Sequence, residues 1–127
     1  MTQGVRGEAL SVQDQSVELG QQITAVEGQA AEGLAALRFA AEQWEEYALV
    51  MRDGTASFEE ASLRMGVQSF AAQQVLAGRR ELDAFVGQLA REQSALFEDI
   101  AREVRSRSAA EVERLREERV RCRGTDL

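Results

Sequence analysis

The chain has 127 residues, with no proline, no histidine, one cysteine and a formal net charge of −7. Its length suits one domain or one helical hairpin, and its richness in Ala, Glu, Gln, Leu, Val and Arg favours an all-α fold. Without histidine, the commonest general acid–base group is missing, as is a frequent metal ligand. No Gly-rich phosphate loop or nucleophile elbow is present. We therefore expect neither an enzyme nor a bound cofactor, metal or small-molecule substrate.

The distribution of charge and apolar residues points to a cytoplasmic protein. No apolar run approaches the roughly 18 residues of a membrane span, and the N-terminus does not have the pattern of a signal peptide. All fifteen basic residues are arginine. Residues 1–101 carry seven arginines against sixteen acidic residues, whereas residues 102–127 carry eight against six. The basic residues are thus enriched toward the end of the chain.

The first predicted element is a helix over about residues 8–51. Its apolar residues recur at alternating steps of three and four, which is the heptad spacing of a helix that packs along another helix. A helix of about 40 residues is roughly 60 Å long, so we expect an elongated molecule. The seam positions are Leu19, Ile23, Val26, Ala30, Leu34, Leu37, Ala41, Trp44, Ala48 and Met51.

Residues 52–57 are predicted to form the turn of an antiparallel hairpin. Asp53 and Gly54 are turn-forming residues, and Ser57 with Glu60 has the spacing of a helix capping box. A continuous helix interrupted only by a glycine is the alternative at this point.

A second helix is predicted over about residues 58–120. Its seam is mostly apolar, but polar residues occupy some of the seam positions. Its apolar positions are Phe58, Ala61, Met65, Ala72, Val75, Leu82, Val86, Leu89, Leu96 and Ile100. We interpret the polar seam positions Gln68, Arg79 and Gln93 as frayed or solvent-facing turns. Three phenylalanines lie beside this seam, so the helix should contact two neighbours, namely the first helix and a second subunit. The predicted partner or dimer interface comprises Trp44, Phe70, Phe85, Leu89, Phe97 and Ile100.

The segment after Ile100 has few large apolar residues. Ser108 with Glu111 has capping-box spacing, so either a break near residues 106–110 or a continuous helix fits the sequence. Glu111 and Arg114 have the i,i+3 spacing of an exposed helical ion pair. Five glutamates within residues 102–123 offset the arginines, so we expect no nucleic-acid partner. Cys122 is interpreted as an incidental exposed thiol, and residues 1–127 are expected to form a single coiled-coil unit.

Three stretches together resemble the helical BAR region of sorting nexins, in particular the retromer-associated kind. They include Trp44 followed by Glu45, an aromatic–acid–isoleucine run at Phe97 to Ile100, and a Glu-Val pair at Glu111. The stretches are "AVEGQAAEGLAALRFAAEQWEEYALVM", "AAQQVLAGRRELDAFVGQLAREQSALFEDIAREVR" and "EVERLREERV". The chain departs from the family in a four-residue insertion at residues 107–110 and in lacking a first BAR helix and a phosphoinositide-binding domain.

The resemblance implies a divergent or partial module for dimerisation and membrane association in endosomal protein sorting. On this reading the protein lies peripherally on an endosomal membrane and contacts its anionic surface. The arginines that the resemblance would place toward lipid are Arg79, Arg80, Arg91, Arg102 and Arg105. The alternative is a coiled-coil scaffold or chaperone-like subunit that binds a partner helix and has no contact with lipid.

Overall fold

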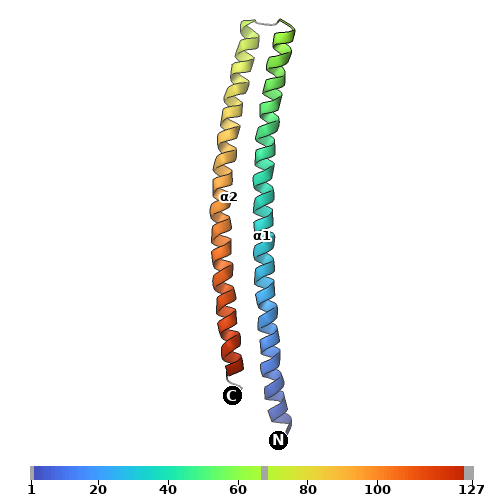
Figure 1. The fold of residues 1–127 in the computed structure, drawn as a ribbon, viewed down its shortest axis with the longest axis vertical. Coiled ribbons are helices and arrows are strands. Elements are labelled where there is room, and N and C mark those ends of the chain that lie inside the picture. Colours follow the sequence, from blue (N-terminus) through green and yellow to red (C-terminus); the bar gives the residue numbers. More distant parts are fainter. Residues whose placement is uncertain (1, 67–68, 125–127) are drawn as a thin grey trace. The chain divides into compact units, whose positions relative to one another are not determined.

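Two long α-helices make up the fold. The computed structural model describes residues 2–66 and 69–124, with side chains from residue 11 onward. Helix α1 (Thr2–Arg64) and helix α2 (Phe70–Gly124) pack against each other as an antiparallel hairpin (Figure 1). The predicted all-α hairpin is therefore confirmed.

The turn between the helices follows residue 64, so its predicted position at residues 52–57 is wrong. Gly66 ends the first helix with a left-handed φ of 68°, and its N–H donates to the carbonyl oxygen of Leu63 at 3.2 Å. The hydroxyl oxygen of Ser69 caps α2 by accepting a hydrogen bond from the Ala72 N–H at 3.2 Å. Glycine favours this backbone conformation and serine favours the helix N-cap, so these two residues delimit the helices.

Both helices are continuous at the two places where the sequence suggests a turn or a break. Residues 52–57 belong to α1 and residues 106–110 belong to α2. Of the two alternatives at the second place, the continuous helix is correct. Gln68, expected at a polar seam position, lies outside the described residues.

The seam predicted for α1 is confirmed by burial. Ile23 is buried and the other nine predicted positions, from Leu19 to Met51, are half-buried. The same spacing continues beyond the predicted helix end, through buried Thr55 and half-buried Phe58. The Thr55 hydroxyl donates to the Met51 carbonyl oxygen at 3.2 Å, which satisfies this buried polar group within the helix.

The packing divides into two units. One unit contains residues 1–35 and 100–127, and the other contains residues 36–99. The core of the first is a cluster of Ile23, Val112 and Leu115. In the second, buried Val86 and Ala90 of α2 are small, so the seam there is thin.

Replacing Gly66 by alanine should destabilise the protein. A left-handed φ costs a residue with a Cβ about 1–2 kcal/mol, so we expect the free energy of unfolding to fall by about 1 kcal/mol. Urea denaturation followed by circular dichroism at 222 nm measures this change.

Gly28→Ala is the matched control, because Gly28 is helical and exposed and an added Cβ would meet nothing within 4 Å. Alanine is the better helix former, so this variant should gain about 1 kcal/mol. Equal effects of the two substitutions would contradict the assigned end of α1.

Candidate interaction surfaces

In the unit of residues 36–99 the α2 seam keeps the expected positions Arg79, Val86 and Gln93. The other expected positions, Val75, Leu82, Leu89 and Leu96, are replaced by the residues that directly follow them. The buried and half-buried residues at steps of three and four are Leu76, Arg79, Asp83, Val86, Ala90, Gln93 and Phe97. Val75, Leu82 and Leu96 were expected in the seam but are exposed by 50%, 47% and 49%. Arg79 and Gln93 thus face the seam instead of forming solvent-facing turns.

A contact between an arginine and a glycine accounts for one polar seam position. The Arg79 guanidinium lies over the Phe58 ring, 5.5 Å from its centroid, a contact worth about 0.5–1 kcal/mol when exposed. A Cβ on Gly54 would be 3.1 Å from Arg79 Nη2, so the glycine leaves room for the guanidinium. Among the described residues, Arg79 Nε and Asp83 Oδ1 are buried without a hydrogen-bond partner. Arg79 is therefore part of the hairpin packing, which disfavours its predicted place on a lipid-facing surface.

A groove lies on the charged side of the unit of residues 36–99. It is lined by Glu45, Leu49 and Arg52 of α1 and by Gly87, Arg91, Ser94 and Glu98 of α2, with seam and neighbouring alanines between them. Each of these seven residues directly follows a seam position of its own helix. Residues that follow the seam on the two antiparallel helices therefore share one side of the hairpin. Residues that precede the seam must share the opposite side, because one residue step turns a helix by about 100°.

The opposite side carries a surface that we name the apolar face. It is defined by the residues that directly precede seam positions. Those of α1 are Ala40, Gln43, Tyr47, Val50, Gly54, Ser57 and Ala61, and those of α2 are Val75, Gly78, Leu82, Phe85, Leu89, Glu92 and Leu96. Val75, Leu82, Leu89 and Leu96 follow an uninterrupted seven-residue repeat.

The apolar face exposes several large side chains. Tyr47, Val50 and Phe85 are exposed by 51%, 60% and 64%. Glu92 is its only charged residue, and its carboxylate accepts a hydrogen bond from Gln88 Nε2 at 3.2 Å. An exposed apolar patch of this kind marks a contact site for another molecule more often than an ordinary solvated surface.

The six predicted interface residues do not form one surface. Phe85 and half-buried Leu89 lie on the apolar face, whereas Trp44 and Phe97 are half-buried in the seam of the hairpin. The Trp44 ring meets Tyr47 edge-on, with centroids 6.4 Å apart. The two remaining residues are exposed elsewhere on α2, Phe70 at its first position and Ile100 in the other unit. Sequence reasoning missed Tyr47 and Val50 as surface residues, although their positions directly before the correctly predicted α1 seam would have identified them.

The remaining arginines of the lipid-facing prediction are exposed. Arg80 forms an ion pair with Glu59 at 2.8 Å between Nη2 and Oε1. Arg91, Arg102 and Arg105 are exposed on α2, and each directly follows a buried or half-buried residue. Within the unit of residues 36–99, Glu45 and Glu98 line the same groove as Arg91, so charges of both signs occur there.

The unit of residues 1–35 and 100–127 has a second arginine packed on a glycine. Arg119 Nε donates to Ser16 Oγ at 3.1 Å, and a Cβ on Gly20 would be 3.3 Å from Arg119 Nη1. Cys122 is half-buried one turn farther along α2. Its thiol lies 3.3 Å from Gln15 Oε1 and 3.8 Å from the Val12 carbonyl oxygen, so it is not the exposed thiol that was expected.

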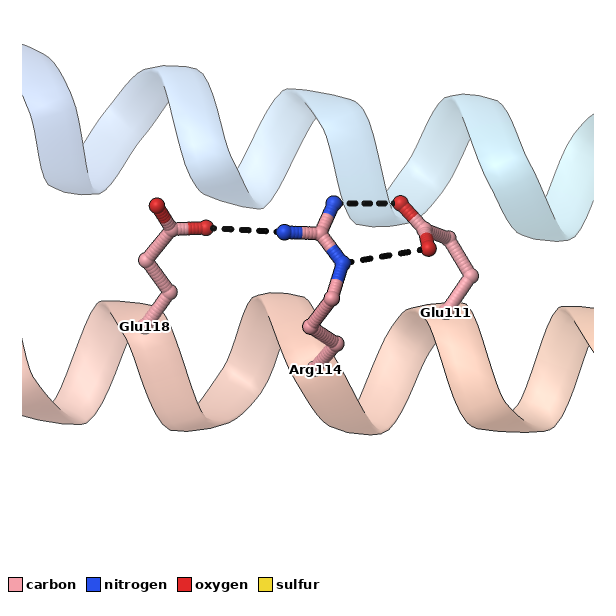
Figure 2. Close-up of polar contacts among 3 residues, drawn as sticks. All are labelled: Glu111, Arg114 and Glu118. Carbon is pink, nitrogen blue, oxygen red and sulfur yellow. Dashed lines mark hydrogen bonds and ion pairs between the residues drawn. The ribbon is translucent and has the colours of Figure 1, made fainter.

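A charged triad on α2 carries the resolved pKa shifts. Figure 2 shows Arg114 between Glu111 and Glu118. Arg114 Nη2 lies 2.6 Å from Glu111 Oε1, and Arg114 Nη1 lies 3.5 Å from Glu118 Oε2. The hydrogen bond from Arg114 lowers the pKa of Glu111, and the same bond raises the pKa of Arg114. The predicted pair of Glu111 and Arg114 is thus present, and both side chains are substantially exposed.

Two other types of site are absent from the described part of the chain. No helix there is long and apolar enough to cross a membrane. Within residues 2–66 and 69–124 there is also no group of three or more His, Cys, Asp or Glu side chains that could hold a metal ion.

Comparisons with known proteins leave the family open. No family model, curated protein or solved structure matches the chain. The resemblance to the sorting-nexin BAR region therefore stays a prediction.

The pKa of Glu111 should rise toward its ordinary value when Arg114 is replaced by glutamine. Because the folded-state pKa is lowered, the pair stabilises the fold above the unfolded pKa, and this contribution disappears as pH falls through the folded pKa. Exposure of both side chains makes the effect on stability small. NMR titration of the Glu111 side-chain carboxyl measures the pKa directly.

Arg107→Gln is the control, because Arg107 pairs with Glu103 and not with the triad. It should leave the Glu111 titration unchanged. If Arg114→Gln and Arg107→Gln shift the Glu111 pKa equally, the ion pair is not the cause.

Proposed function

We propose that the chain is a non-enzymatic helical interaction module that binds a protein partner through the apolar face. The observation that carries this proposal is the heptad repeat of Val75, Leu82, Leu89 and Leu96 on a helix whose seam with α1 uses other residues. A seven-residue apolar repeat is the pattern with which one helix packs along another. The partner surface is therefore expected to be helical.

The charge pattern of the hairpin supports binding on this side. The groove side carries Glu45, Arg52, Arg91 and Glu98, whereas the apolar face has the single charge of Glu92. Charged residues are depleted at the centres of protein interfaces, and aromatic residues such as Tyr47 and Phe85 are enriched there. A scaffold or chaperone-like subunit would use such a face to hold a helix of its partner.

Membrane association, as the BAR resemblance implies, is a second proposal. It is favoured by the exposure of Arg80, Arg91, Arg102 and Arg105, each of which directly follows an α2 residue that is buried or half-buried. A basic residue near an anionic membrane contributes on the order of 1 kcal/mol. The ion pair of Arg80 with Glu59 and the acidic residues that line the groove with Arg91 offset this attraction. For this reason endosomal sorting at a membrane ranks behind a protein partner.

Site-specific photocrosslinking in the cells that make the protein tests the proposed function. Benzoylphenylalanine in place of Phe85 should give a discrete protein adduct, because this position lies on the apolar face. The same probe at Leu49 is the control, since Leu49 is similarly exposed, at 53%, but lines the groove on the other side.

Three outcomes would contradict the proposal. Protein adducts of equal yield from both positions would show no preference for the apolar face, and no protein adduct from Phe85 would leave the face without a protein partner. Lipid adducts at Leu49, without protein adducts at Phe85, would favour the membrane proposal instead.

A further inference from the structure

We infer that the apolar face binds the same face of a second copy of this chain, with α1 of each copy lying along α2 of the other. This inference rests on the proposed function and names its partner. The two-fold axis runs parallel to the helices between the copies, and the result is a four-helix assembly in which neighbouring helices are antiparallel.

The contacts within the hairpin determine which residues lie level with one another. Two contacts between long side chains show which residues of α1 and α2 are approximately level: Arg79 with Phe58, and Arg80 with Glu59. Each step forward along α1 corresponds to a step backward along α2, because the helices are antiparallel. Counting from these contacts gives the levels of the apolar-face residues to within one or two positions.

Large residues of α2 are level with small residues of α1 across the apolar face. Leu82 is level with Gly54, Leu96 with Ala40, and Val75 with Ala61. A rotation about the proposed axis keeps every level and exchanges the two helices. It therefore places Leu96 of one copy over Ala40 of the other and Val75 over Ala61, the alternation of large and small side chains that lets packed layers interdigitate. Gly54 is not part of this alternation, because the Arg79 guanidinium of the same chain already lies against it.

The remaining positions of the face are also complementary under this rotation. Tyr47 of one copy meets Leu89 of the other, and Gln43 comes within reach of Glu92. The Gln43 amide can donate a hydrogen bond to the Glu92 carboxylate, which adds a second polar partner to its hydrogen bond from Gln88. The alternative two-fold axis, perpendicular to the helices, would instead stack leucine on leucine and leave glycine opposite alanine.

The near absence of charge on the apolar face favours a second copy over a basic helix, whereas the net negative charge of the unit opposes self-association. Residues 36–99 contain six arginines and eleven acidic residues, so a basic partner would be attracted mainly to the charged sides. The apolar face offers such a partner only Glu92, whereas a second copy brings an equally uncharged surface. Burial of charge is costly unless it is paired, and this pairing of faces avoids it.

The extent of the face suits a small dimer. Val75 to Leu96 spans about 30 Å at 1.5 Å per residue, and two helices side by side are about 20 Å wide. The resulting footprint of about 600 Å² per copy is near the lower end of specific protein interfaces. We therefore expect a dimer that dissociates on dilution.

Sedimentation equilibrium of wild type, Val50→Glu and Leu49→Glu tests the inference. These neighbouring residues are exposed by 60% and 53%, but Val50 lies on the apolar face and Leu49 lines the groove. Wild type and Leu49→Glu should be dimers, and Val50→Glu should raise the dissociation constant at least tenfold, roughly the effect of leaving one buried charge unpaired. Circular dichroism should show equal helicity for all three, because glutamate is a good helix former.

Either of two results would overturn the inference: a wild-type chain that is monomeric at all concentrations, or equal dimerisation of the two variants. If the wild type is monomeric while the Phe85 probe still crosslinks to a different protein, the second-copy inference fails and the proposed function stands. If the Phe85 probe also gives no protein adduct, both fail.

Disulfide formation tests the arrangement in a Cys122→Ser background. A mixture of Tyr47→Cys and Leu89→Cys chains should form a heterodimer disulfide, because the proposed axis places these residues together. Tyr47→Cys alone should not form one, since its two copies lie diagonally across the assembly. Rapid crosslinking of Tyr47→Cys alone would support the perpendicular axis and overturn the arrangement.

Discussion

The packing of α1 against α2 is the constraint on which the other features depend. Helix α2 offers two heptad stripes that differ by one residue, and only one of them can face α1. In the unit of residues 36–99 the hairpin uses the stripe that contains Arg79, Asp83 and Gln93. The more apolar stripe of Val75, Leu82, Leu89 and Leu96 remains outside this seam, so the hairpin leaves an apolar surface on one side of this unit.

Glycines of α1 leave room for arginine side chains of α2 between the two helices. Gly54 leaves room for the Arg79 guanidinium, and Gly20 does the same for Arg119 in the other unit. A glycine within a helix costs about 1 kcal/mol relative to alanine, and these contacts help to offset that cost. Both arginines thereby contribute to the packing of α1 against α2.

Much of the fold could be predicted from the sequence, but the choice of the α2 stripe could not. The α1 seam and the ion pair of Glu111 with Arg114 depend on local spacing, which the sequence contains. The turn was placed at Gly54 because glycine next to aspartate resembles a turn, whereas the glycine there accommodates Arg79 and Gly66 ends the helix. Hydrophobicity alone favours the apolar stripe as the hairpin seam, because it does not include the favourable contact of the Arg79 guanidinium with the Phe58 ring.

Hydroxyl-radical footprinting of Phe85 tests most directly whether the apolar face is covered in solution. Phe85 is exposed by 64% within one chain, so an uncovered face would label it readily. If the apolar face is covered, Phe85 should be labelled slowly in the concentrated wild-type protein and several-fold faster in Val50→Glu. Equal, fast labelling of Phe85 in both proteins would contradict this expectation.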